Sequence, residues 1–159
     1  MKHTKLKIAL ACDHAGFVSK KKLVPELSKE GYSVSDYGIY SETPADYPDV
    51  AEKVALAVQD GRIGRGVLIC GSGVGVSVVA NKFSGVRAAV CHDSYSARQG
   101  VEHDNMNVLC LGSRVLGYEL MKEITLVFLG SRFSGDKRYL QRLDKLRRIE
   151  QSNMRSEQP

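Results

Sequence analysis

The sequence predicts a single α/β domain in which a parallel sheet is covered by helices on both faces. Two observations lead to this fold class. Short apolar runs recur along the 159 residues without the polar alternation of half-exposed strands, as in residues 66–70 and 107–112. Helix-like segments separate these runs, which is the pattern of a doubly wound α/β fold. We expect residues 1–151 to form the domain and residues 152–159 to be a disordered tail.

Five segments have the composition of buried strands, because aliphatic and β-branched residues dominate each of them. In chain order they are KIALAC at 7–12, YSVSDY at 32–37, GVLIC at 66–70, VRAAVC at 86–91 and NVLCLG at 107–112. The first of these follows a basic N-terminus and resembles a short signal peptide. Its apolar part is too short for that, and Asp13 and His14 follow at once, so a first strand is the better interpretation.

Six segments between or after these runs are expected to be helices. The first is stopped by Gly31, and Pro25 inside it should kink the helix or shift its start. The third follows the glycine-rich residues 71–75. In chain order the expected helices cover residues 17–30, 49–59, 76–82, 95–102, 116–129 and 137–151.

Composition narrows the class of protein. Apolar residues make up 43% of the chain and charged residues 26%, which is ordinary for a globular domain. No apolar run reaches the roughly 18–20 residues of a membrane span. None of the four cysteines forms a CxxC pair, and each lies at or near the end of an apolar run. We therefore expect reduced cysteines in a cytoplasmic protein that has no membrane partner.

The net charge of +5 comes mostly from the C-terminal residues 137–159, which hold seven Lys or Arg and three Asp or Glu. A basic segment can indicate nucleic-acid binding. No aromatic residue follows Tyr139, however, so this segment lacks the stacking platforms of such proteins. A solvated helix face combined with an anion site explains the charge with fewer assumptions, and we expect no nucleic-acid partner.

The loop CGSGVG, which begins at Cys70, is the most informative motif. Ligands of doubly wound folds bind at the carboxyl ends of strands, where this loop lies. It is not a dinucleotide fingerprint, because Val76 occupies the sixth position of GxGxxG, and it lacks the Lys of a phosphate-binding NTPase loop. A cysteine phosphatase would need an arginine where Val76 stands. Two interpretations of the loop remain. It is either a glycine turn without a ligand, or a site that binds an oxyanion beside the Cys70 thiol.

Several side chains near the expected strand ends could act with this loop. A helix N-terminus stabilises a thiolate, and a thiolate at Cys70 could remove a proton from a carbon next to a carbonyl. His14 and His103 could move protons near neutral pH, although a lone histidine is more often structural. Arg138 and Arg142 are four residues apart, so they either clamp one phosphate or belong to a solvated face. Arg114 follows another strand end and could be a third anion contact.

Taken together, the motifs resemble the ribose-5-phosphate isomerase B family, which also includes galactose-6-phosphate isomerase subunits. The resemblance spans nearly the whole chain. The segments that carry it are ACDHAGF (11–17), ADYPD (45–49), LICGSGVGVSVVANK (68–82), GVRAAVC (85–91), EHDNMNVLCLGSR (102–114) and KRYLQRLDKL (137–146).

The resemblance implies a Rossmann-like, three-layer fold with a five-stranded parallel sheet, in a homodimer or homotetramer with shared active sites. It implies interconversion of ribose 5-phosphate and ribulose 5-phosphate through an enediolate, without cofactor or metal. Cys70 would be the base, and His103 would open the sugar ring. Further substrate contacts are implied at Cys12, Asp13, His14, Tyr47, Gly71, Ser72, Gly73, Val74, Gly75 and Asp104, and phosphate contacts at Arg114, Arg138 and Arg142.

Two features separate this chain from parts of the family. One branch has a glutamate where Val76 stands, so this chain resembles the cysteine branch. The family usually has Asn where Asp104 stands. Asp104 therefore keeps other substrates open: a four-carbon ketose phosphate, allose 6-phosphate or galactose 6-phosphate. The presence of Cys70 and His103 in one chain argues against a galactose-6-phosphate isomerase subunit that needs a different partner. The third alternative is a non-catalytic sugar-phosphate-binding module.

Overall fold

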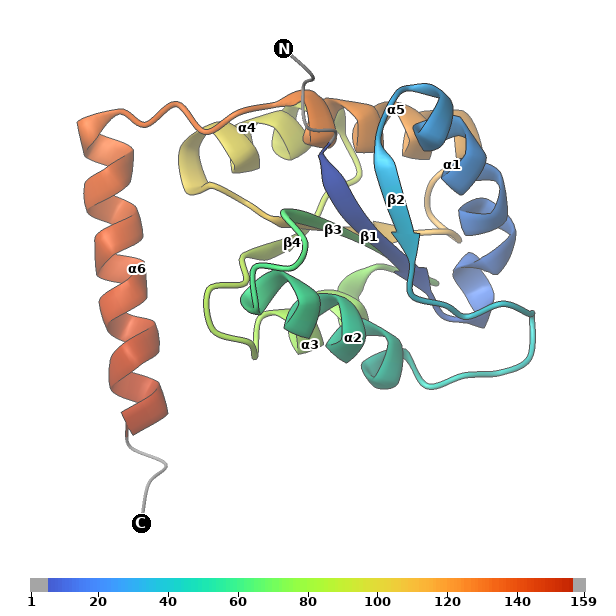
Figure 1. The fold of residues 1–159 in the computed structure, drawn as a ribbon, viewed down its shortest axis with the longest axis horizontal. Helices are drawn as coiled ribbons and strands as arrows, with labels where there is room; N and C mark the ends of the chain where they lie inside the picture. Colours follow the sequence, from blue (N-terminus) through green and yellow to red (C-terminus); the bar gives the residue numbers. More distant parts are fainter. Residues whose placement is uncertain (1–5, 156–159) are drawn as a thin grey trace.

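The computed structural model describes residues 6–155, and the chain forms a five-stranded parallel sheet with the strand order β2-β1-β3-β5-β4 (Figure 1). The strands are β1 Lys7–Cys12, β2 Ser33–Asp36, β3 Arg65–Cys70, β4 Ala88–Val90 and β5 Val108–Gly112. A 3-10 turn, η1 His14–Gly16, precedes the helices α1 Phe17–Lys29, α2 Tyr47–Gln59, α3 Val74–Ala80, α4 Ser94–Asp104, α5 Tyr118–Gly130 and α6 Lys137–Arg155.

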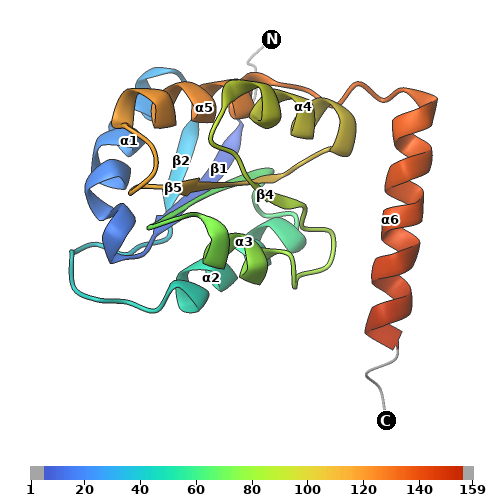
Figure 2. The ribbon, with the colours of Figure 1, turned by 180° about the vertical axis from the view of Figure 1, so that it is seen from behind.

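The sheet is the middle of three layers, as Figures 1 and 2 show from opposite sides. Alternate strand residues serve the two faces. Leu10 and Ile69 pack with side chains of α1, α4 and α5, whereas Ala11 and Leu68 pack with those of α2 and α3. Burial on both faces explains why the strand sequences lack polar alternation. The predicted α/β fold with a five-stranded parallel sheet is confirmed.

Some element boundaries differ from the prediction. Helix α1 begins at Phe17 and continues past Pro25 to Lys29, so the proline neither ends it nor shifts its start. Proline removes only the bond to the carbonyl of Lys21, which lies on the exposed side of the helix where water can replace it. Helix α4 extends two residues beyond its expected end and therefore includes His103.

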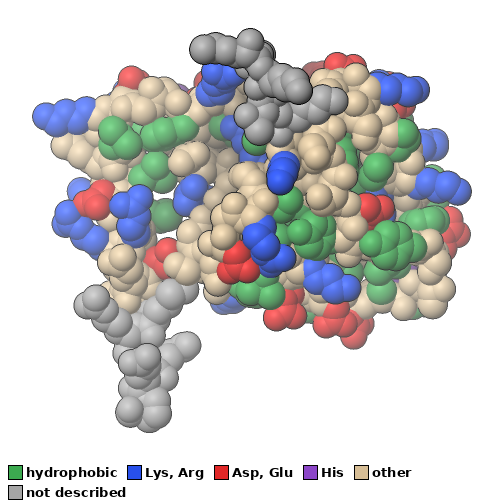
Figure 3. All heavy atoms as spheres, in the orientation of Figure 1, with side chains coloured by type: hydrophobic (Ala, Val, Ile, Leu, Met, Phe, Trp, Pro, Cys, Tyr) green, Lys and Arg blue, Asp and Glu red, His purple; other side chains and the backbone are tan. Residues whose placement is uncertain are grey.

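Helix α6 does not cover the sheet but stands beside the three layers, joined to α5 by residues 131–136 (Figures 1 and 2). Its first turn is attached by Tyr139, whose ring stacks on His103. Its other end is attached by Glu150, which accepts hydrogen bonds from the Ser84 hydroxyl at 3.2 Å and the Gly85 amide at 2.9 Å. Lys and Arg side chains are prominent along it in Figure 3.

The C-terminal prediction was partly wrong, because α6 continues to Arg155 and so includes half of the segment 152–159 that was expected to be disordered. Residues 156–159 lie outside the described residues. Within the described part of the chain, every helix is too short or too polar to cross a membrane.

Candidate active site

Predicted site residues lie at the carboxyl ends of three neighbouring strands. Asp13 follows β1, Cys70 ends β3 and Arg114 lies just beyond β5. The register places Cys70 beside Gly112 of β5 and Ile69 beside Cys12 of β1. Because β1, β3 and β5 are adjacent and parallel, their ends meet. The structure therefore brings these predicted residues together.

The glycine loop holds the Cys70 sulfur against the start of α3. The Gly73 amide donates a hydrogen bond to Cys70 Sγ over 3.0 Å, and α3 begins at the next residue. Gly73 has a φ of +81°, and a Cβ there would lie 3.0 Å from the Leu111 carbonyl carbon. A glycine is therefore required for this close approach. The sulfur therefore lies at the start of a helix and accepts one backbone hydrogen bond, and Cys70 as a residue is 4% exposed.

Tyr47 and Ser72 line the outer side of the loop. The Tyr47 ring, from the first turn of α2, lies so close to Gly75 that a Cβ at Gly75 would be 2.8 Å from the ring. Ser72 is exposed, and its hydroxyl accepts a hydrogen bond from the Val74 amide at 3.3 Å. These residues form an accessible rim beside the buried sulfur.

The segment after β1 is held by its own polar side chains. Asp13 Oδ1 accepts hydrogen bonds from the amides of Ala15 and Gly16 at 2.9 and 3.2 Å, so this carboxylate caps the turn η1. His14 Nδ1 accepts a hydrogen bond from the Ala45 amide at 3.3 Å, which ties the turn to the loop before α2. Both side chains therefore have defined positions at the edge of the site.

Cys12 is placed differently from its predicted role as a substrate contact. Its side chain is fully buried in the core between the sheet and α1. Burial raises the pKa of the Cys12 thiol to about 11, so this thiol stays neutral. A neutral side chain inside the core has no surface to offer a sugar, and Asp13 is the nearest polar side chain at this strand end.

Arg114 lies over the glycine loop, and sequence reasoning missed the residue before it. A Cβ on Gly71 would lie 3.5 Å from Arg114 Nε, so the guanidinium covers the first turn of the loop. Ser113 donates from its hydroxyl toward the carbonyls of Ala15 and Cys70 at 2.9 and 3.0 Å. This serine ties three strand ends together. The only signal in the sequence was a hydroxyl residue directly after a strand.

His103 lies at the opposite edge of the sheet from Cys70. Helix α4 starts near the carboxyl edge and runs back over its 11 residues, a length of roughly 16 Å. Asn107, which follows it, accepts a hydrogen bond from the Gly66 amide at 2.9 Å. Gly66 precedes Cys70 by four strand residues, or about 13 Å. A single chain therefore does not bring Cys70 and His103 to one sugar.

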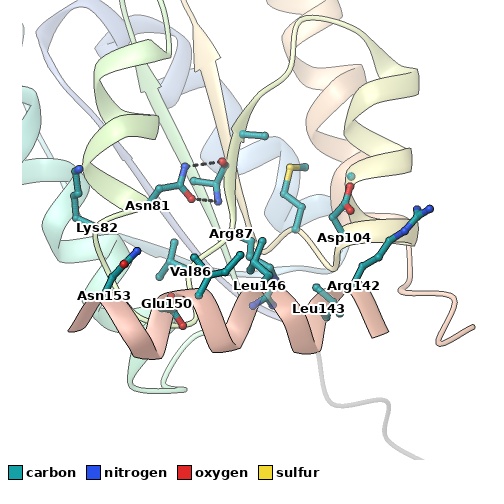
Figure 4. Close-up of a pocket in the computed structure, with 15 residues that line it drawn as sticks. Asn81, Lys82, Val86, Arg87, Asp104, Arg142, Leu143, Leu146, Glu150 and Asn153 are labelled. Atoms are coloured by element: carbon teal, nitrogen blue, oxygen red, sulfur yellow. Dashed lines mark hydrogen bonds between the residues drawn. The ribbon is translucent and has the colours of Figure 1, made fainter. Parts of the chain in front are cut away.

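A second group of predicted residues surrounds His103. Arg138 donates a short hydrogen bond to the Tyr139 hydroxyl, and the Arg142 guanidinium lies 5.7 Å from the centre of the Tyr139 ring. The Tyr139 ring stacks on the His103 ring with 4.2 Å between centroids. Asp104 and Arg142 reach the surface beside this cluster (Figure 4). The predicted site residues thus form two separate groups, one at each edge of the sheet.

A groove of about 720 Å³ lies next to the second group, between α6 and the edge strand β4 (Figure 4). Asp104 and Arg142 are among its lining residues. Its apolar lining residues include Val86, Ala89, Met106, Leu143 and Leu146. Within residues 6–155, no cluster of three or more His, Cys, Asp or Glu side chains is arranged to hold a metal ion.

Comparison with known proteins decides the family. The profile of the Ribose/Galactose Isomerase family matches residues 8–146. The chain belongs to the ribose/galactose isomerase family. Ribose-5-phosphate isomerase B of Escherichia coli strain K12 is 48% identical over 145 residues, covering 91% of this chain and 97% of that relative. D-erythrulose-4-phosphate isomerase of Pectobacterium atrosepticum is 44% identical over 132 residues, covering 82% and 86%.

Solved structures from the ribose/galactose isomerase family have the same fold as this chain. Clostridium thermocellum ribose-5-phosphate isomerase B superposes with a TM-score of 0.90 at 42% identity, covering 93% of this chain and 99% of that chain. Ribose-5-phosphate isomerase B from Mycoplasma genitalium, solved with bound ribulose 5-phosphate, has a TM-score of 0.88 at 39% identity, covering 94% and 99%. The predicted family and the expectation of a sugar-phosphate isomerase are confirmed.

Proposed function

We propose that this chain interconverts D-ribose 5-phosphate and D-ribulose 5-phosphate through an enediolate, without a metal or organic cofactor. The observation that carries the proposal is the Cys70 sulfur, which lies 3.0 Å from a backbone donor at the start of α3. A base must lie beside preorganised N–H groups for the negative charge of an enediolate to be stabilised where it forms. The family and its solved relatives support the same assignment.

In the isomerisation step, the Cys70 thiolate takes the proton from C2 of the open-chain aldose. The electron pair of that C–H bond forms the C1–C2 double bond of the enediolate, and the carbonyl oxygen becomes negative. The same thiol then returns the proton to C1, and the proton on O2 moves to O1. No oxidant is consumed. The backbone N–H groups of the loop and of the start of α3 stabilise the oxygen charge.

The ring of ribose 5-phosphate must open first. The bond between C1 and the ring oxygen breaks, the ring oxygen gains a proton and the hydroxyl on C1 loses one. His103 is the group proposed to assist this exchange. Arg114, Arg138 and Arg142 bind the phosphate, which takes no part in the chemistry. Such a clamp supplies orientation and remote binding energy.

The active site is proposed to form between two copies of the chain, in a homodimer or a homotetramer. Cys70 and His103 lie at opposite edges of the sheet, so a second chain must supply one of them. Exposed apolar side chains lie near both groups: Val74 and Val78 on α3 are 55% and 56% exposed, and Leu140, next to Tyr139 on α6, is 51% exposed. A second copy would cover such surfaces.

A four-carbon ketose phosphate is the second candidate substrate. The exposed Asp104 carboxylate, next to His103 in α4, is consistent with a different substrate, because an amide at this position could donate a hydrogen bond to a sugar and a carboxylate cannot. Relatives named D-erythrulose-4-phosphate isomerase at 44% and 40% identity support this alternative.

The direct test is an isomerase assay with chelator present, on ribose 5-phosphate, a four-carbon ketose phosphate, allose 6-phosphate and galactose 6-phosphate. We expect the highest kcat/KM for ribose 5-phosphate. A higher value for the four-carbon sugar assigns the second candidate. Cys70→Ala should abolish turnover of every substrate, with Cys91→Ala as the matched control. Near-normal turnover by Cys70→Ala would eliminate the proposed base.

A non-catalytic binding module is the remaining alternative. It predicts sugar-phosphate binding without exchange of solvent tritium into C2, whereas the enediolate mechanism requires exchange. The location proposed for the enzyme is the cytoplasm. All four cysteines are free and buried, as expected in a reducing compartment.

A further inference from the structure

The His103 ring is held from two directions by its own chain. Tyr139 stacks on its face with 15° between the ring planes. Gln99 lies one turn earlier on α4, and its side-chain Nε2 lies 2.8 Å from His103 Nδ1. The stack fixes the plane of the imidazole, and the hydrogen bond fixes its rotation within that plane. The orientation of the ring is therefore set before any sugar binds.

The bond between Gln99 and His103 also has a direction. The structure places the amide nitrogen of Gln99, rather than its oxygen, against the ring, and an amide nitrogen donates, so His103 Nδ1 is the acceptor in this arrangement. A neutral imidazole carries one proton, which must then reside on Nε2. Among residues 6–155, Nε2 has no hydrogen-bond partner, and it remains available to a ligand.

We propose that Gln99 is a positioning residue that presents Nε2–H of His103 as a hydrogen-bond donor to the ring oxygen of the bound sugar. The identity of that sugar rests on the proposed function. Negative charge develops on the ring oxygen as its bond to C1 breaks, and a donor aimed at that atom stabilises the charge.

The chemistry of residue 99 determines whether Nε2 of His103 meets the sugar as a hydrogen-bond donor or as an acceptor. A carboxylate at this position would accept a hydrogen bond from Nδ1–H and would leave the lone pair on Nε2. His103 would then meet the sugar as an acceptor. Gln99 and His103 are four residues apart on one helix, so a side chain of the same length as Gln99 reaches Nδ1 without any backbone change.

The first test is the protonation pattern of His103 by long-range proton–nitrogen correlation on the full-length protein labelled with 15N-histidine. His103→Asn identifies the signals by their loss. At a pH where the ring is neutral, we expect a protonated Nε2 and an unprotonated Nδ1. Gln99→Glu should protonate Nδ1, and Gln59→Glu, which adds the same charge at an exposed site on α2, should change nothing. A protonated Nδ1 in the unmodified protein would overturn the proposal, as would an unchanged pattern in Gln99→Glu.

The second test separates ring opening from isomerisation. Gln99→Glu should lower kcat for ribose 5-phosphate by about 10- to 100-fold with KM nearly unchanged. It should leave kcat unaffected for a four-carbon ketose phosphate, which cannot close a ring through its phosphorylated oxygen. Equal losses on the two substrates would contradict a role in ring opening. If the nitrogen pattern is as expected but no sugar phosphate turns over, the proposed function fails and the orientation of His103 stands.

Discussion

At the scale of single residues, the four cysteines differ in what surrounds their sulfur atoms. Burial raises the pKa of Cys12 and of Cys91 to about 11, and it raises the pKa of Cys110 as well. These three thiols stay protonated at neutral pH. Within residues 6–155, Cys70 is the one cysteine whose sulfur accepts a backbone hydrogen bond at a helix N-terminus. Cys70 is therefore the cysteine whose surroundings differ from those of the three protonated thiols.

This contrast predicts selective alkylation. Because only a thiolate reacts, iodoacetamide at pH 7.5 should modify Cys70 first, and a bound sugar phosphate should slow the reaction. Mass spectrometry of the digested protein locates the adduct, and Cys70→Ala is the control that should remain unlabelled. Faster labelling of Cys12 or Cys91 would show that the assignment of the reactive thiol is wrong.

Residues with local signatures were predictable from the sequence, and residues without them were not. Cys70 and the glycines after it were found because a strand, a tight turn and a helix follow one another. Gln99 and Ser113 were missed, since an amide and a hydroxyl carry no motif of their own. Their roles depend on the groups that the fold places beside them, which are the His103 ring for Gln99 and two backbone carbonyls for Ser113.

At the scale of elements, α4 and α6 carry the second group of candidate site residues. Asn105 ends α4 in the left-handed conformation with φ of 49°, which places His103 in the last helical turn. The sequence prediction ended this helix one residue before His103, although asparagine is a known C-terminal signal. Tyr139, which is 2% exposed, then packs α6 against that turn.

The contact between these helices yields a prediction about Tyr139. Tyr139→Leu removes a ring stack worth about 0.5–1.5 kcal/mol beyond its buried area. We expect faster amide hydrogen exchange in the first turns of α6 and a lower kcat for ribose 5-phosphate. Tyr139→Phe keeps the stack and loses only the hydroxyl that Arg138 contacts, so it is the matched control. Unchanged exchange in Tyr139→Leu would mean that α6 is held by Glu150 instead.

The position of α6 could not be predicted from its own sequence. A helix with leucines at positions 140, 143 and 146 looks like any helix that covers a core. In the structure, Leu140 and Leu146 are about half exposed, because this chain offers them no complete partner surface. An amphipathic pattern shows that a face is to be buried, but it does not show which chain buries it.

At the scale of the whole molecule, the parallel sheet separates the two groups of site residues. Every strand ends at the same edge, so residues after strands gather there and residues at the ends of returning helices gather at the other edge. The sequence predicted these residues as one set of candidate site residues. It did not predict their separation, which follows from α4 running antiparallel to β3 and β5.

Cys70 of one chain is proposed to work with His103 of another, and mixing two defective variants tests this pairing. Cys70→Ala and His103→Asn should each be nearly inactive as separate preparations. After unfolding and refolding together, half of the dimers contain one chain of each kind, and one of their two sites has both residues intact. Activity should return to about one quarter of that of the unmodified enzyme. No recovery, despite mixed dimers detected by native mass spectrometry, would contradict the shared site.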